Sequence, residues 1–277
     1  MSGAPPIEAL GRSDATDLRA LSQAVGWTHT SDDWRTILDV GRVYGHRADD
    51  GGFASSGALF EYGAAFASIG MILVAPAYRG RGLARAMMRH CVAVAGTRSV
   101  TLIATAQGEP LYRSLGFIDV ERVCRVLIAG GLGGGRLASI TTRDVESIIT
   151  FDANTFGADR RVMLAALLSR AEATALVDDA GGGVRGFGLA ARQSGRFVIG
   201  PVVARETDDA LALVRSLALD AGGEIRLEVP TRQTRLLEML AALGGRRIDD
   251  APVMLYGATA MPGRREGIYA LASRGLG

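Results

Sequence analysis

The sequence predicts a mixed α/β protein made of two similar domains in tandem, each with a central mixed β-sheet flanked by helices. Three observations support this fold class. Short apolar runs and helical spacings follow one another along all 277 residues. The stretch Ala129–Arg136 has five glycines in eight residues, which is typical of a flexible joint. The order of elements before this joint recurs after it. We therefore expect one domain over residues 1–130 and a second over residues 131–277.

In the first half, hydrophobic spacing predicts both helices and strands. A helix is expected over residues 16–26, and Ser31 is expected to cap a second helix that carries Trp34 and Ile37. A third helix, over residues 83–95, has an apolar position every four residues: Leu83, Met87, Cys91 and Ala95. The remaining predicted elements are strands at 42–47, 57–62, 67–74, 99–104 and 117–128, and a short helix at 110–115.

The second half repeats this order. Strands are predicted at 137–140, 175–177, 186–192, 197–203, 225–229 and 252–256, and helices at 144–151, 159–171, 208–220 and 232–243. Two of its stretches also align with the first half. The sequence IGPVVA at 199–204 resembles GMILVAP at 70–76, and MLAALGG at 239–245 resembles LYRSLGF at 111–117. We infer two copies of one fold.

Composition excludes several classes of protein. The chain is 48% hydrophobic and 22% charged, with a net charge of only +2 and arginines scattered among acids, so nucleic-acid binding is not expected. No run approaches the roughly 20 apolar residues of a membrane span, and residues 1–8 lack the apolar core of a signal peptide. The two cysteines and three histidines show no metal-ligand spacing. A cytoplasmic monomer or homodimer without a metal is the expectation.

The strongest functional signal is the segment ILVAPAYRGRGLA, from Ile72 to Ala84. An apolar strand ends at Pro76, a Gly/Arg turn follows, and a helix begins at Leu83. The first N–H groups of a helix have no partners within the helix, so an anion can bind there. Glycine lets the backbone approach phosphate oxygens, and arginine adds charge and forked donors. The segment therefore predicts a site for a phosphorylated cofactor.

The spacing of this loop narrows the choice of cofactor. It lacks the Lys and the Ser or Thr of a Walker-type loop, and Arg85 stands where a dinucleotide fingerprint needs its third glycine. The pattern R-x-x-G-x-A does fit, at Arg79, Gly82 and Ala84. Together with the preceding apolar strand and proline, it resembles the acyl-CoA-binding motif of the GNAT superfamily of N-acyltransferases. The motifs that carry this resemblance lie in residues 70–117.

The resemblance implies an enzyme that moves an acetyl group from acetyl-CoA to an amine by direct attack. In that family, the loop amides bind the pyrophosphate of coenzyme A. The preceding strand splays from its neighbour, and its free N–H groups pair with the pantetheine arm and polarise the thioester. The positions implied for coenzyme A are Ile72, Leu73, Val74, Arg79, Gly80, Arg81, Gly82, Leu83, Ala84 and Thr105. Thr105 stands where the family often has Asn.

The second half lacks this loop chemistry. At the aligned position it reads RETDDA, residues 205–210, with no glycine and with three acids that would repel phosphate. The whole arrangement resembles tandem GNAT proteins in which the N-terminal domain binds acyl-CoA and performs catalysis. The C-terminal domain is then degenerate and closes the acceptor side.

Candidate catalytic residues follow from the needs of acyl transfer, namely a neutral amine and a protonated leaving thiolate. Tyr112 lies in LYRSLGF, which resembles the family segment whose tyrosine often protonates the thiolate. Ser68 occupies the place of a catalytic Glu found in some members, where it can hold a water. Other candidates for the base are Glu61, Glu109 and His29, whose ordinary pKa of about 6.5 suits the task.

The acceptor is expected to be a small-molecule amine, because a second domain tends to enclose the site. Trp27, His29 and Trp34 lie in the helical region that usually forms one wall of the acceptor site in this fold, and tryptophans can line an amine pocket. Two other functions remain open. One is a non-catalytic module that binds or senses acyl-CoA, and the other is an interaction scaffold without a cofactor.

Overall fold

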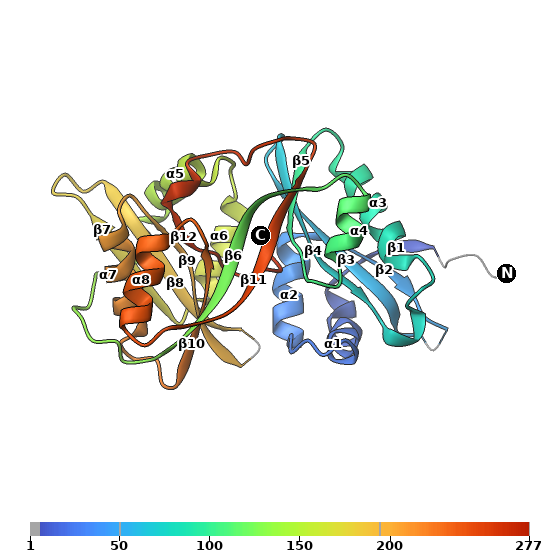
Figure 1. The fold of residues 1–277 in the computed structure, drawn as a ribbon, viewed down its shortest axis with the longest axis horizontal. Coiled ribbons are helices and arrows are strands. Elements are labelled where there is room, and N and C mark those ends of the chain that lie inside the picture. The colour runs from blue at the N-terminus through green and yellow to red at the C-terminus, as the bar shows by residue number, and fades with distance from the viewer. Residues whose placement is uncertain (1–5, 50, 194, 277) are drawn as a thin grey trace.

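The computed structural model describes residues 6–49, 51–193 and 195–276, which form a mixed α/β fold around one continuous 12-stranded sheet (Figure 1). The predicted fold class is confirmed. The strand order is β1-β2-β3-β4-β5-β11-β6-β10-β9-β8-β7, and β12 pairs with β9. Residues 1–5, on which much of the expectation about a signal peptide rests, lie outside the described residues. None of the described helices is long and apolar enough to cross a membrane.

The described residues of the first half form six strands and four α-helices: β1 (Ile7–Leu10), α1 (Ala15–Ala24), α2 (Ser31–Val40), β2 (Arg42–Arg47), β3 (Phe53–Tyr62), β4 (Phe66–Val74), α3 (Leu83–Ala95), β5 (Ser99–Ile103), α4 (Glu109–Ser114) and β6 (Ile118–Ala129). Short 3₁₀ turns lie at Arg12–Asp14 and Pro76–Tyr78. Helices α1 and α2 pack on one face of the sheet with β3 and β4, and α3 and α4 cover the opposite face.

The second half follows the same order: α5 (Val145–Phe156), α6 (Arg161–Arg170), β7 (Ala173–Asp178), β8 (Val184–Gln193), β9 (Arg196–Ala204), α7 (Thr207–Ala218), β10 (Glu224–Pro230), α8 (Thr234–Ala242), β11 (Arg246–Tyr256), a 3₁₀ turn at Arg265–Gly267 and β12 (Ile268–Ala270). Helices α7 and α8 pack into the main core of this half, and α5 and α6 cover the other side.

Several predicted elements need correction. Thr30, not Ser31, caps α2, because its hydroxyl accepts from the Asp33 N–H at 3.1 Å while Asp33 accepts from the Thr30 N–H at 2.9 Å. The predicted strand at 137–140 is only an isolated bridge between Ala138 and Leu176. Strands β1 and β12 were not predicted, because each is too short to show an alternating pattern.

The two halves exchange strands at the centre of the sheet. Strand β11 of the second half lies between β5 and β6, and β6 of the first half pairs with β10. Both long strands therefore run through the middle of the molecule and join its two halves, as Figure 1 shows. A division at residue 130 describes the order of the chain, while the sheet itself is continuous across it.

Candidate active site

Strands β4 and β5 separate at the centre of the first half. Their parallel pairing covers only Phe66 to Ser68 against Ser99 to Thr101, so the last residues of β4 have no partner strand on that side. The pairing of β4 with β3 shifts register between Ser56 and Ala58, opposite Met71. Among the described residues, Met71 is the non-glycine with positive φ, at +57°, a conformation that costs free energy. A bulge of this kind re-aims the end of the strand.

The loop after β4 is shaped to hold an anion. Gly80 and Gly82 have φ of +75° and +79°, and a Cβ added at either would meet no atom within 4 Å. Gly82 is the N-cap of α3, so the unpaired N–H groups of the first turn of the helix lie beside open space. The loop therefore has the backbone donors and the room that a phosphate group needs.

A cavity of about 460 Å³ lies between this loop, the end of β4 and α4. All the positions predicted for coenzyme A line it except Arg81, whose guanidinium lies over the Tyr78 ring at 4.8 Å from its centroid. Val25, Gln107 and Gly108 also line it. No motif marks these three residues in the sequence. We call this space the loop cavity.

A second cavity, of about 560 Å³, lies between the two halves of the molecule, and we call it the interdomain cavity. Its walls come from the bulge of β4, from α2, and from β8, β10 and β11 of the second half. The residues that line both cavities are Trp27, Ile72, Thr105 and Tyr112. The two spaces therefore adjoin at these four residues, Tyr112 among them.

Tyr112 is the acid candidate that the geometry supports. It lies on α4, is 7% exposed, and passes so close to Gly108 that a Cβ there would stand 2.8 Å from its hydroxyl oxygen. Among the described residues no hydrogen bond engages this hydroxyl. Burial raises the pKa of Tyr112 to about 12, so the phenol stays protonated at neutral pH.

His29 is the base candidate that reaches the same space. It lines the interdomain cavity, and its Nδ1 is buried without a hydrogen-bond partner in the described part of the chain. Burial lowers the pKa of His29 from its ordinary 6.5, Asp33 opposes this shift, and Arg226 adds to it. The imidazole is therefore neutral at neutral pH and able to accept a proton.

The structure does not bring the other base candidates to either cavity. Ser68 is 1% exposed and donates to the backbone oxygen of Leu276 at 3.2 Å, so it has no room for a catalytic water. Glu61 forms ion pairs with Arg42 and Arg98 at 3.0 and 3.2 Å. Glu109 forms an ion pair with Arg113 at 2.8 Å. The sequence placed these residues near the motif but could not show which way their side chains point.

The two predicted tryptophans differ in role. Trp27 lines both cavities. Trp34 lines neither, because its side chain is fully buried and its indole N–H donates to the Ser22 hydroxyl at 2.9 Å. Its ring lies 6.3 Å from that of His29. Trp34 is therefore a core residue and its assignment to the acceptor site was wrong.

In the second half, the matching space is filled by the chain itself. Strands β9 and β10 pair only at Phe197 and Val198 and then separate, as β4 and β5 do. The short strand β12 lies in this gap and pairs with Val202 and Val203 of β9, and Leu271 just after it forms a bridge to Glu228 of β10. At the start of α7, the acids Asp208 and Asp209 bind Arg235 and Arg185 at 2.8 Å.

Comparisons with known proteins agree with this duplicated architecture. Residues 40–119 and 148–270 each match a model of the acetyltransferase (GNAT) domain. The uncharacterized N-acetyltransferase YitH of Bacillus subtilis is 28% identical over an alignment of 267 residues that covers 94% of this chain and 94% of that protein. The holothin acyltransferase of Pseudoalteromonas sp. is 25% identical over 235 residues, covering 80% of this chain and 77% of that protein.

Solved structures show the same fold. A candidate acetyltransferase from Pyrococcus horikoshii superposes with a TM-score of 0.82 at 20% identity, covering 98% of this chain and 95% of the other. A tandem GNAT protein from the clavulanic acid biosynthesis pathway superposes with a TM-score of 0.65 at 15% identity, covering 92% and 99%.

Fold, site and comparisons together define an enzyme of the acyltransferase class. The chain belongs to the GNAT superfamily of acetyltransferases and carries two GNAT domains in tandem.

Proposed function

We propose that the protein transfers the acetyl group of acetyl-CoA to the amine of a small molecule. The observation that carries this proposal is the meeting of the loop cavity and the interdomain cavity at Tyr112. Two substrates that enter from opposite sides would react at that point. An acceptor space of about 560 Å³ between the halves suits a small molecule better than a segment of folded protein.

The first half has the groups that acetyl-CoA needs. The pyrophosphate would bind the N–H groups at Gly82 and the first turn of α3, with Arg79 beside it. The pantetheine arm would pair with the free edge of β4 at Ile72 to Val74, where β5 has turned away. The N–H groups of this edge would also polarise the thioester carbonyl.

The proposed reaction is a direct displacement. The neutral amine nitrogen attacks the thioester carbon, the C–N bond forms, and the C–S bond breaks. His29 takes the proton that the amine loses, and Tyr112 gives its proton to the leaving thiolate. The pKa of about 12 for Tyr112 reflects a dry site, and the same burial raises the proton affinity of a thiolate there.

Substitution of His29 by Gln should remove the decrease in kcat at low pH. His29 accepts a proton only when neutral, so kcat at saturating amine should fall as the pH drops through a value below 6.5. In the variant, kcat should be lower by at least about 100-fold, and this fall with pH should be absent. His90→Gln is the matched control, because His90 lines neither cavity. An unchanged profile in H29Q would remove His29 as the base.

Titration calorimetry with acetyl-CoA tests the donor site. We expect one site per chain in the micromolar range, because β12 fills the matching gap of the second half. Two sites would contradict this role of the second half. Binding without turnover on any amine would favour an acyl-CoA sensor, and no binding would leave only an interaction scaffold.

A further inference from the structure

The wall of the interdomain cavity opposite β4 is built from charged residues of the sheet. Glu228 on β10 is 1% exposed and is the centre of this wall. Its carboxylate accepts from Arg125 of β6 at 2.8 Å and from Arg274 at 2.6 Å. Arg274 also binds Asp249 at 2.5 Å. These two arginines and two carboxylates neutralise one another, which leaves Arg226 as a further positive charge.

Among the described residues, no carboxylate lies within hydrogen-bond distance of Arg226. Its side chain is only 16% exposed, and its Nε lies 3.7 Å from the Glu228 carboxylate, too far for a hydrogen bond. This Nε is buried without a hydrogen-bond partner in the described part of the chain. One hydrogen bond does engage the guanidinium, from Nη2 to the Gln193 side-chain oxygen at 3.3 Å. A buried guanidinium with incomplete pairing lowers the stability of the folded state. We therefore expect Arg226 to have a function that offsets this cost.

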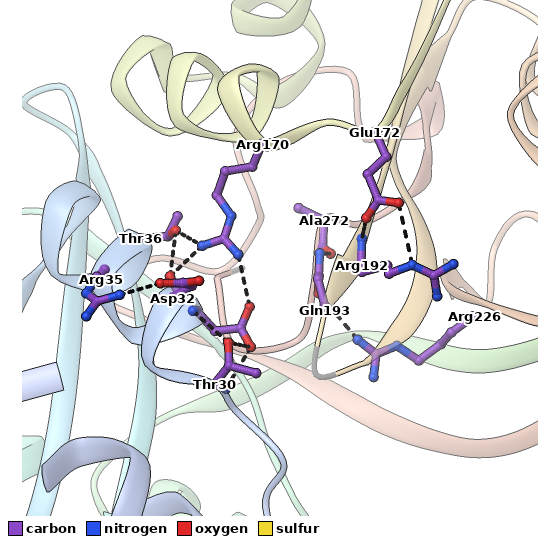
Figure 2. Close-up of polar contacts among 11 residues, drawn as sticks. Thr30, Asp32, Arg35, Thr36, Arg170, Glu172, Arg192, Gln193, Arg226 and Ala272 are labelled. Carbon is purple, nitrogen blue, oxygen red and sulfur yellow. Dashed lines mark hydrogen bonds and ion pairs between the residues drawn. The ribbon is translucent and has the colours of Figure 1, made fainter. Parts of the chain in front are cut away.

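Neighbouring groups hold the guanidinium of Arg226 in place. The amide nitrogen of Gln193 donates to the backbone oxygen of Ala272 at 3.0 Å, which turns the amide oxygen toward Arg226. Figure 2 shows this arrangement together with Arg170, which lines the same cavity and binds Thr36 and the backbone of Asp32. Arg192 lies beside Gln193, 3.6 Å from Glu172. Arg226 lines the cavity, and its one ion pair in the described part of the chain is with Glu228, whose carboxylate already binds Arg125 and Arg274.

Arg226 and His29 line the same cavity, and the positive charge of Arg226 contributes to the lowered pKa of His29. We propose that the acceptor amine carries a carboxylate and that Arg226 binds it, with the amino group toward His29. A planar guanidinium matches a carboxylate with two parallel hydrogen bonds. This inference rests on the proposed function for the amine, but the anion site itself can be tested without turnover.

The binding test uses thermal unfolding with glutarate as the probe. At equal ionic strength, sodium glutarate should raise the Tm of the wild-type protein above its value in sodium chloride, because a ligand that binds the native state stabilises it. The difference should vanish in Arg226→Gln and shrink in Arg226→Lys, which keeps the charge but loses the fork. Arg196→Gln, at an exposed arginine outside the cavity, should behave as wild type. No shift, or an equal shift in R226Q, overturns the site.

The turnover test compares amines that differ only in the anion. Free amino acids should be acetylated at least about 10-fold better in kcat/KM than their carboxamides. The R226Q variant should lose that preference, and the control variant R196Q should keep it. Better turnover of the carboxamides, or of O-phosphoethanolamine over every amino acid, overturns the carboxylate assignment. If no amine reacts while the glutarate shift persists, the proposed acetyl transfer fails and the anion site stands.

Discussion

Replacement of Gly82 by glutamate is expected to weaken acetyl-CoA binding by at least about 100-fold, which corresponds to about 2.7 kcal/mol. The φ of Gly82 is +79°, a conformation that a side chain makes strained. Its Cβ would point into open space at the N-terminus of α3, where a carboxylate would take the place of the pyrophosphate and repel it. Titration calorimetry of G82E with acetyl-CoA measures the effect.

Gly244→Glu is the matched control for this substitution. Gly244 follows α8, has φ of +86°, and a Cβ there would also meet nothing within 4 Å. The two variants therefore introduce the same charge and a similar backbone strain at different places. Full acetyl-CoA affinity in G82E would contradict the assignment of the loop, and lost affinity in G244E would point to a general effect on folding.

The loop could be predicted from the sequence because its parts are neighbours in the chain. Strand, turn and helix N-terminus all fall within residues 72–95, and the helix begins and ends where its spacing predicts. Tyr112 became a candidate because LYRSLGF resembles a segment of the GNAT superfamily, and the structure places it on α4, which follows β5 after a short turn. Local order and glycine spacing are enough to define such a site.

The interdomain cavity could not be predicted in this way. Its walls join His29, Arg226 and Arg274, which lie far apart in the chain and meet only through the exchange of β6 and β11. The placement of Ser68 failed for a related reason. Its position along the strand was right, but Leu276 from the far end of the chain covers its hydroxyl.

The two halves also differ in a way that sequence patterns did not reveal. Buried backbone N–H and C=O groups need partners, so a gap between diverging strands has to be filled. In the second half, β12 supplies those partners from the chain itself. In the first half, the edge of β4 is left open beside a cavity, with the strained Met71 at its bend. The unfilled copy is therefore the one suited to a ligand with an extended, hydrogen-bonding arm.

Tyr112→Phe should lower kcat by about 100-fold and leave the Kd for acetyl-CoA within about twofold of wild type, because general acid catalysis contributes about 100- to 10,000-fold. The substitution removes one oxygen and keeps the ring, which packs 6.3 Å from Phe117. Single-turnover kinetics and calorimetry separate the two quantities. Tyr256→Phe is the matched control, since Tyr256 also lies against Phe117, at 5.3 Å, but lines neither cavity. A Y112F enzyme with wild-type kcat would show that another group, or water, protonates the thiolate. A loss of acetyl-CoA affinity equal to the loss of kcat would instead assign the hydroxyl to binding.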